Sequence, residues 1–424
     1  MKVCIAGDDI ASQFKDFRKA FEKQGVNVCT YVHRKPNSVI ITQDSYDYIG
    51  FDNIPSFFRA CSKFLRGFNN KILRLIDFYI TRYLIFFYNR KLLKRISEDT
   101  DVFIFMWSSF WLNYSDLAYL KKKGKKIVFI FCGDDARWYW SMKQDFETSG
   151  LKIAEYPKDY NYGIIGLIDR LQRMRMAEKY ADLIYSKREQ AQLQLRSYYH
   201  FPMTIDLTQF EGCNKKQNTI PIVIHTPSNQ TVKGTKYVLE VLDRLEMEGV
   251  KFEKSIISNL SNTEVLQQMC KADIMIDQLL LPGGGKAASE ALASGCVVLS
   301  LMGYNKYKQA SYYDYCPIID VDTENLYNKL KEIIQDLSTR KIISSQGPLF
   351  AKSYLDVELF IKMMLKRLEN EIADEKIMPT FFRDKFDPEN FIAKCIYNYY
   401  TRLISKASWY KSDIKSGYRN GLYF

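Results

Sequence analysis

The stretch DIMIDQLLLPGGGKAASEALASGCVVLS, residues 273–300, decides the fold of this chain. Its first part is a short apolar strand that ends near Asp277, and a glycine-rich turn follows. A helix of small residues begins near Lys286 and stops at Gly295, because glycine readily adopts the left-handed conformation that ends many helices. Residues 296–299 then form a second buried strand. This order predicts a parallel α/β sheet with a ligand site at the carboxyl ends of its strands.

Three consecutive glycines, Gly283, Gly284 and Gly285, precede the expected helix. They carry no side chain that would keep a ligand from the first N–H groups, and the helix dipole adds about half a positive charge there. An anion is therefore the expected ligand, and Lys286 adds a formal cation. Glu290 lies one turn further along, where a carboxylate can accept hydrogen bonds from a sugar diol. We expect a nucleotide-diphosphate pocket; for the glycines taken alone, a tight connection without a ligand is the alternative.

A second stretch supplies another wall of the expected pocket. Residues 221–225 read as a strand, 226–232 as a polar loop that contains Ser228, and Lys233 with Gly234 opens the next helix. Lys233 therefore also lies at a strand-to-helix junction at the same edge of the sheet. Two lysines and two helix N-termini that face one crevice would make a good diphosphate site.

These two stretches resemble the donor-binding half of retaining glycosyltransferases of the GT-B fold, and most of all the family 4 group that uses UDP-, GDP- or related sugars. The similarity lies in HTPS followed by KGT (residues 225–235) and in GGG followed by SEALASGCVV (residues 283–298). It implies that Lys233 contacts the diphosphate and that Glu290 binds the ribose. It also implies that Asn259, in the loop after the strand expected at 252–258, faces the nucleobase.

Two positions depart from the family pattern. The family usually has a second glutamate before Glu290, and the corresponding residue here is Pro282. The sugar contact of that glutamate is then missing or is made by another group, such as Lys286 or the backbone of the three glycines. In the first half, the family often has a histidine before a Gly-x-Asp turn, and Cys132 stands there instead. Both departures bear on catalysis and leave the expected fold unchanged.

The resemblance covers roughly residues 200–355 well and implies a GT-B architecture: α/β, with two Rossmann-like domains facing each other across a cleft and a C-terminal helix that crosses back to the first domain. We expect an acceptor-side domain over residues 1–210 and a nucleotide-sugar-binding domain over 220–372. A helical tail over 373–424 is expected to pack on the first domain or on a membrane. Helices are also expected over 187–196, 323–336 and 355–371, the last two closing the second domain.

The first domain opens with a strand over residues 1–6, and further strands end near Trp107 and Cys132. Polar groups just past the ends of such strands are where ligands bind in α/β sheets. The expected acceptor-side residues are Gly7, Asp8, Trp107, Asp134 and Arg137. Asp134 is also a catalytic candidate, together with Lys233 and Lys286. The alternative for Asp134 and Arg137 is a helix N-cap with a nearby ion pair.

Residues 55–96 form an aromatic and basic insert with ten Lys or Arg residues and one acid, Asp77, in a chain whose net charge is +12. Its apolar residues alternate with cations at helical spacing, which favours a pair of amphipathic helices on an anionic membrane surface. The alternative is a helix pair that faces the core and has a solvated charged side. A nucleic-acid partner is not indicated, because no recognised binding module accompanies the charge.

The composition, 424 residues with 47% hydrophobic, suits two globular domains. The nine cysteines are scattered singly and only three histidines are present, so neither a metal site nor a disulfide framework is indicated. A reducing compartment and no cofactor are expected. No run of 18 apolar residues occurs and the chain opens on a strand pattern, so we expect a cytoplasmic protein, peripheral on the inner face of the membrane.

The function that the sequence favours is transfer of a hexose-type sugar from a nucleotide diphosphate to a lipid-linked or polysaccharide acceptor, without a metal and with retention. The alternative is a catalytically lapsed GT-B protein that binds a nucleotide sugar, a partner or a membrane; Pro282 and Cys132 motivate it. A nucleotide-sugar epimerase is less favoured, because the acidic and histidine groups that it needs cannot be assigned.

Overall fold

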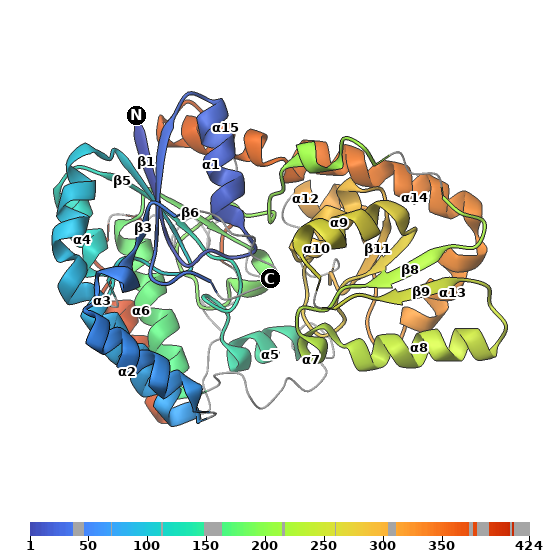
Figure 1. Cartoon of the computed structure of the whole chain (residues 1–424), viewed down its shortest axis with the longest axis horizontal. Helices are drawn as coiled ribbons and strands as arrows, with labels where there is room; N and C mark the ends of the chain where they lie inside the picture. Colours follow the sequence, from blue (N-terminus) through green and yellow to red (C-terminus); the bar gives the residue numbers. More distant parts are fainter. Residues whose placement is uncertain are drawn as a thin grey trace.

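The computed structural model describes residues 1–36, 46–68, 70–111, 113–147, 163–213, 217–258, 260–303, 311–372, 376–379, 390–407, 409 and 410. These residues build two parallel β-sheets, which Figure 1 shows as two lobes with helices packed around each sheet. This arrangement confirms the α/β class and the two Rossmann-like domains expected from the sequence.

The first sheet has seven strands in the order β3-β2-β1-β4-β5-β6-β7, all parallel. The elements of this domain, in chain order, are β1 (Lys2–Gly7), α1 (Gln13–Lys23), β2 (Asn27–Val32), β3 (Tyr48–Ile49), η1 (Gly50–Asn53), α2 (Ser56–Gly67), α3 (Lys71–Asp99), β4 (Val102–Met106), α4 (Ser115–Lys122), β5 (Lys126–Ile130), α5 (Tyr139–Glu147), α6 (Ile164–Tyr180), β6 (Leu183–Ser186), η2 (Arg188–Gln190), β7 (Tyr199–His200) and η3 (Leu207–Phe210).

The second sheet has five parallel strands in the order β12-β11-β10-β8-β9. The remaining elements are β8 (Ile222–His225), α7 (Gln230–Lys233), α8 (Thr235–Met247), β9 (Glu253–Ile256), α9 (Asn262–Lys271), β10 (Ile274–Ile276), α10 (Lys286–Ala293), β11 (Val297–Ser300), α12 (Ser311–Tyr315), β12 (Ile319–Asp320), α13 (Leu326–Gln335), α14 (Leu337–Phe350), η4 (Ala351–Leu355), α15 (Val357–Leu368) and α17 (Phe391–Arg402).

Both faces of the first sheet are buried, because side chains alternate along each strand and helices cover either side. On β1, Val3 and Ile5 pack on the face that α1 and α15 cover. Cys4 and Ala6 point to the opposite face and join residues of α3, α4 and α6. The strands therefore form a rigid base, and their carboxyl ends carry the loops that hold the candidate site.

The chain crosses between the lobes twice, and the two crossings are bonded to each other. The Ile205 N–H donates to Leu355 O (2.9 Å), and the Val357 N–H donates to Ile205 O (3.1 Å). After this point α15 packs on α1, where the rings of Phe360 and Phe17 lie 5.7 Å apart. Figure 1 shows α15 beside α1, far from the second sheet. The predicted return of a C-terminal helix to the first domain is confirmed, and α15, which was expected to close the second domain, is that helix.

The tail also contacts the first domain. Helix α17 packs on α6, and Ala393 is buried in the core that α6 covers. The Tyr198 N–H donates to Ile377 O (3.0 Å) and the Ile377 N–H donates back to Tyr198 O (2.8 Å), which fixes the chain between α15 and α17. The described part of the tail therefore packs on the first domain.

One predicted helix is wrong. Residues 187–196 contain only the short η2 segment. The carboxylate of Glu178 accepts hydrogen bonds from the N–H groups of Leu195 (2.5 Å) and Arg196 (3.1 Å), so these groups do not enter a helical ladder. The sequence also missed α5 and α14, the second of which contains Gly347 and Pro348 near its end.

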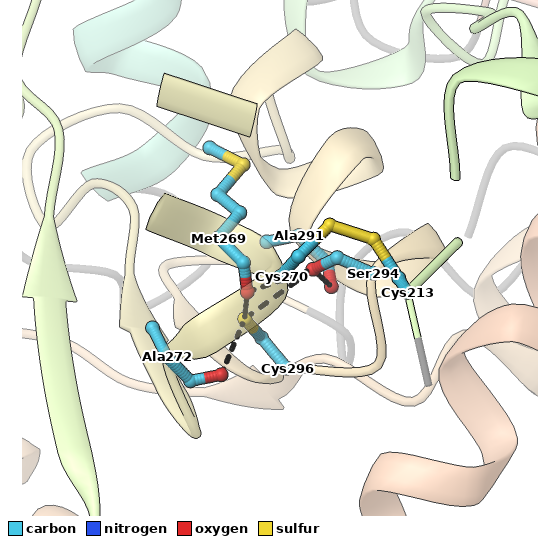
Figure 2. The surroundings of a disulfide bond; sticks show 7 residues. All are labelled: Cys213, Met269, Cys270, Ala272, Ala291, Ser294 and Cys296. Carbon is cyan, nitrogen blue, oxygen red and sulfur yellow. Dashed lines mark hydrogen bonds between the residues drawn. A yellow bond between two sulfur atoms is a disulfide. The ribbon is translucent and has the colours of Figure 1, made fainter. Parts of the chain in front are cut away.

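The cysteine pattern was misread as well. Cys213 and Cys270 form a disulfide across 57 residues of sequence, with Cα atoms 5.3 Å apart (Figure 2). Their spacing gave no signal, because the end of η3 and the end of α9 meet only in the folded chain. Beside this bond, the Cys296 thiol lies 3.4 Å from the carbonyl oxygens of Met269 and Ala272. The expectation of no disulfide is therefore wrong for this pair.

Candidate functional site

The loop between β10 and α10 is held by hydrogen bonds from both sides. The Gly283 N–H donates to Leu301 O (2.9 Å), and the Gln278 amide donates to Gly283 O. Gly283 has a φ of +91°, and a side chain there would collide with the carboxylate of Glu189. Glycine is required at this position for both reasons.

Lys233 lies beside this loop, but it does not open a helix as expected: it is the last residue of the short α7, and α8 begins at Thr235. Its ammonium donates to Asp277 Oδ1 (2.6 Å) and Gln278 Oε1 (3.0 Å), and a Cβ built on Gly285 would lie 3.4 Å from Lys233 Nζ. Asp277 is buried and also accepts from the Gly285 N–H (3.2 Å). Because an ammonium has three N–H donors, one donor of Lys233 remains for a ligand at the start of α10.

The start of α10 offers further donors. Among the described residues, the amides of Gly284, Lys286 and Ala287 have no hydrogen-bond partner. Free N–H groups at a helix start, next to a lysine, form a site for an anion. The groups at this edge are therefore of the kind that bind a phosphate in other proteins.

The Lys286 side chain points away from the expected donor pocket. Its ammonium reaches the first domain, where it donates to Ala11 O (2.6 Å) and to Asp16 Oδ2 (2.6 Å). The reason is its position as the first residue of α10, opposite the N-terminal end of α1. Contact of this ammonium with a donor phosphate stays a prediction.

Glu290 is 5% exposed and accepts a hydrogen bond from the Asn262 side chain (3.2 Å). Burial raises the pKa of Glu290 to about 7, and the nearby Lys286 ammonium opposes that rise. Asn262 begins α9, directly after the loop that was expected to face the nucleobase. Asn259 lies outside the described residues, and Ser228 is exposed on the loop before α7. The nearby His225 uses both ring nitrogens within its domain, on Ile276 O (2.7 Å) and Thr235 Oγ1 (2.9 Å).

The first-domain residues follow the ends of β1, β4 and β5. Gly7 has a φ of +123° and packs against the Met106 and Ser108 carbonyls, so a side chain would not fit there. Asp8 accepts from the Ser108 hydroxyl (2.6 Å), which brings the ends of β1 and β4 together. Trp107 lies at the same edge, directly after β4.

Asp134 lies at the cleft, and the neighbouring Asp135 holds the turn that follows β5. Asp135 accepts from the N–H groups of Cys132 (3.0 Å) and Gly133 (2.7 Å), and burial raises its pKa to about 6. Asp134 pairs with Arg137, with Oδ1 and Nη1 3.3 Å apart. The ion pair of the alternative is therefore present, whereas the hydrogen bonds of Asp135 run to earlier residues of the turn.

Part of each set borders one cavity of about 220 Å³ between the lobes, called here the cleft cavity; Gly7, Asp8 and Lys233 do not line it. Trp107, Asp134 and Arg137 line it from the first domain. Pro282 and the three glycines line it from the second domain, with Gln278, to which Lys233 is bonded. Lys286 and Glu290 are not among its lining residues.

Sequence reasoning missed three contributors to this site. Glu189 lines the cleft cavity and contacts Gly283, and Lys187 donates to Gly284 O (2.9 Å), so the first domain holds the glycine loop directly. Both follow the carboxyl end of β6, and the rule that located Asp134 would have found them had the segment not been taken for a helix. The third is Asp277, which is visible in the sequence only as the end of a strand.

The comparisons with known proteins bear on the fold. No family model and no curated protein matches this chain. Among solved structures, a sucrose-phosphate synthase from Thermosynechococcus elongatus aligns with a TM-score of 0.53 over 88% of this chain and 100% of its own. The catalytic domain of starch synthase IV from Arabidopsis thaliana, bound to ADP and acarbose, gives 0.51 over 87% and 98%.

An E. coli structure described as trehalose-6-phosphate bound with UDP-2-fluoro glucose gives a TM-score of 0.55 over 88% of this chain and 100% of its own. Each of the three is 10% identical in sequence to this chain. Identity at this level shows the fold and nothing finer. Together with the two parallel sheets, the double crossing and the returning helix, these alignments assign the chain to the GT-B fold.

Proposed function

We propose that this protein is a glycosyltransferase that moves a sugar from a nucleotide-diphosphate donor to an acceptor on the first domain. The observation that carries the proposal is the cleft cavity, which has the N-terminal end of α10 on one side and Trp107, Asp134 and Arg137 on the other. A donor and an acceptor react fastest when one enclosed space holds both in a fixed orientation. Two structural neighbours carry ADP or a UDP-sugar analogue, which supports this choice of donor class.

On the donor side, the free amides of Gly284 and Lys286 and the remaining N–H of Lys233 would hold the diphosphate. These groups would also stabilise the charge that develops as the diphosphate leaves, which is the largest contribution expected in such a site. The Lys286 ammonium adds to this only where a donor phosphate draws it from Asp16. Glu290, next to Asn262, would accept the hydroxyl groups of the ribose.

Glu189 would take the place of the glutamate that Pro282 replaces. Its carboxylate lines the cleft cavity next to Gly283, one residue after Pro282, although it comes from the opposite domain. A carboxylate in this position can accept hydrogen bonds from the hydroxyl groups of the transferred sugar. Asp134 and Arg137 would orient the acceptor. The family resemblance further implies a hexose and retention, which the anomeric configuration of the product would test.

The acceptor would be a glycan or a lipid-linked molecule at an anionic membrane surface. Helices α2 and α3 pack on each other, and their outer sides expose large apolar side chains. More than a third of each of these side chains is exposed: Phe57, Phe58, Phe64, Phe68, Ile72, Leu75, Ile76, Phe78, Tyr79, Ile80, Tyr83, Phe87 and Tyr88. Apolar area of this extent among cations fits the interface of a membrane. No helix within the described ranges is long and apolar enough to cross a bilayer.

A thermal-shift panel of UDP-, GDP-, ADP- and CMP-sugars tests the donor site first. A ligand at 100 times its dissociation constant adds about 2.7 kcal/mol to the free energy of unfolding. We expect one nucleotide to raise the melting temperature of the wild type. Failure of every nucleotide to do so would overturn the proposal.

Lys233→Met should weaken that nucleotide by about tenfold or more, because a charge-assisted hydrogen bond to phosphate is lost. Lys236→Met is the matched control, since Lys236 lies three residues further on, in the first turn of α8, and its side chain is 81% exposed. Because Lys233→Met leaves the buried Asp277 unpaired, the double variant with Asp277→Asn serves as a second test. Turnover of the bound donor then separates an active transferase from the catalytically lapsed alternative.

A further inference from the structure

A second cavity, of about 180 Å³, lies in the first domain next to the cleft cavity, and Trp107 lines both. Four arginines surround it: Arg34, Arg66, Arg82 and Arg173. The carboxylates on its lining are Asp8 and Asp169. We call this space the arginine cavity. The proposed donor and acceptor residues do not account for its charge.

Three of the four arginines have partners inside the protein. Arg34 and Arg66 share Asp77, at 3.6 Å and 2.7 Å, and Asp77 is almost fully buried. Burial opposes the ionisation of Asp77, but hydrogen bonds from Ser62 and Arg66 hold its pKa below the usual value. Arg173 pairs with Asp169 (2.6 Å). Three arginines therefore share two carboxylates, so this group already carries one positive charge in excess.

Arg82 is different. It is 8% exposed, and within the part of the chain that the structure describes it has no hydrogen bond and no ion pair. The guanidinium carbon of Arg82 lies 5.8 Å from the centroid of the Phe78 ring. A buried cation without a partner is costly, which is why such groups usually pair or bind a ligand.

Asp8 is the remaining carboxylate of the lining, and its Oδ2 accepts from the Ser108 hydroxyl (2.6 Å). The four arginines still outnumber the three carboxylates near them, Asp8, Asp77 and Asp169. Burial and the Arg82 charge lower the pKa of His33 to about 3, so this ring is neutral and engages Ser109 O (2.6 Å). The cavity therefore keeps an excess positive charge with donors that face an enclosed space.

We propose that the arginine cavity binds the phosphate group of a lipid-linked acceptor. The planar guanidinium forks of Arg82 and its neighbours match the geometry of phosphate oxygens. The cavity is lined by residues of α3, whose outer side exposes Tyr79, Ile80 and Tyr83, so an acyl or isoprenoid chain could lie on α3 while its phosphate enters. The shared wall at Trp107 would then direct the acceptor toward the donor. Its description as an acceptor site rests on the proposed function; the phosphate site itself does not.

The binding test uses farnesyl phosphate, with farnesol, farnesoic acid and inorganic phosphate as comparisons, measured by calorimetry on the full chain. Wild type should bind farnesyl phosphate and, more weakly, inorganic phosphate, but not farnesol. Arg82→Gln should weaken both phosphate probes by about tenfold or more. Arg90→Gln is the matched control, because Arg90 lies two turns further along α3 and is exposed. Its binding should equal that of the wild type.

Each other result overturns the proposal. If Arg82→Gln and the wild type bind farnesyl phosphate equally, the arginine cavity is not the phosphate site. If Arg82→Gln and Arg90→Gln lose the same affinity, the phosphate binds through surface charge alone. Farnesoic acid binding as tightly as farnesyl phosphate means a general carboxylate or anion site. Binding to vesicles of phosphatidylcholine and phosphatidylglycerol is measured as well. If Arg82→Gln weakens vesicle binding more than it weakens farnesyl phosphate binding, the ligand of the cavity is the headgroup of a bulk phospholipid. A wild type that binds neither phosphate probe has no such site.

The melting temperature and the nucleotide-induced thermal shift show whether a loss of phosphate binding comes from misfolding or from damage to the donor site. Arg82→Gln removes an unpaired buried charge, so its melting temperature should equal or exceed that of the wild type. Arg82→Lys keeps the charge without the fork and should bind phosphate with intermediate affinity. The nucleotide-induced thermal shift should persist in all three variants. Loss of phosphate binding with a normal nucleotide shift therefore concerns the arginine cavity alone.

Discussion

Lys286 Nζ lies 2.6 Å from Asp16 Oδ2, although Lys286 begins α10 of the second domain and Asp16 belongs to α1 of the first. The two side chains are 13% and 4% exposed, so the pair is largely removed from water. Burial raises the pKa of Asp16, and the Lys286 ammonium opposes that rise. A side chain expected to serve the donor is therefore engaged in holding the two lobes together.

Asp16→Asn should lower the free energy of unfolding by about 3 kcal/mol, because the substitution leaves the Lys286 ammonium buried without its counter-charge. Chemical denaturation checks this. Glu358→Gln breaks another ion pair of α1, with Lys23, whose side chains are 42% and 43% exposed. It should change stability little. Equal losses in the two variants would contradict a special role for the pair at the cleft.

Gly283→Ala should lower both stability and donor affinity. The added methyl group would meet the Glu189 carboxylate, and the backbone has a φ of +91°. Gly124→Ala is the control, because Gly124 has a φ of +71° with no atom within 4 Å of an added Cβ. Gly124→Ala should cost roughly 1–2 kcal/mol, from the left-handed backbone alone. A Gly283→Ala protein no less stable than the control would mean that Glu189 moves aside freely.

Stability should depend on pH through Glu290. Burial raises the pKa of its carboxyl group from its usual value of 4.5 to about 7, so between these values the folded protein binds more protons than the unfolded chain. The free energy of unfolding should therefore fall as the pH rises from about 4.5 to about 7. Glu290→Gln should reduce this slope in a pH series of denaturation curves. An unchanged slope would assign the effect to other buried carboxyl groups, such as Asp116, whose pKa burial raises to about 7.

Nucleotide binding should show the opposite dependence. An ionised Glu290 accepts hydrogen bonds from the ribose hydroxyl groups more strongly than a protonated one. The donor should therefore bind more tightly at pH 8 than at pH 6, and Glu290→Gln should bind it weakly at both. Titration calorimetry at the two pH values checks this. Equal affinity of the wild type at both would place the ribose elsewhere.

Reduction of the Cys213–Cys270 disulfide should lower the melting temperature. The bond closes a loop of 57 residues, for which the loop-entropy model gives about 4 kcal/mol. Cys213→Ser should show the same loss and no further response to a reductant. Cys61→Ser, which removes an exposed free cysteine of α2, should behave like the wild type. A reductant without effect on wild type would mean that the bond contributes nothing to stability.

The fold was predictable because its signals are local. The strand-to-helix switch near Asp277, the glycines before Lys286 and the stop at Gly295 all appear within one stretch, and the structure has α10 within one residue of the expected bounds. The position of Lys233 beside Gly285 followed from the rule for parallel strands. Features that depend on packing between the lobes could not be predicted from the sequence. These are the direction of the Lys286 side chain, the contact of Glu189 with the glycine loop and the packing of α15 on the first domain.

The same limit explains the remaining errors. Cys213 and Cys270 meet through the tertiary fold, and no spacing rule connects them. From the sequence, the cations of residues 55–96 have one common role, on a membrane surface or a solvated side, yet Arg82 is buried while Arg90 is exposed. A helical period distinguishes two sides of a helix but does not say which cation will find a partner.

The double crossing at Ile205 and residues 355–357 sets how the lobes can move. Because the two chain segments are hydrogen-bonded to each other there, they cannot slide apart independently without breaking those bonds. The two connections between the lobes therefore lie side by side at one point, near Ile205. An opening of the cleft that moves α10 away from α1 would have to break the Lys286–Asp16 contact.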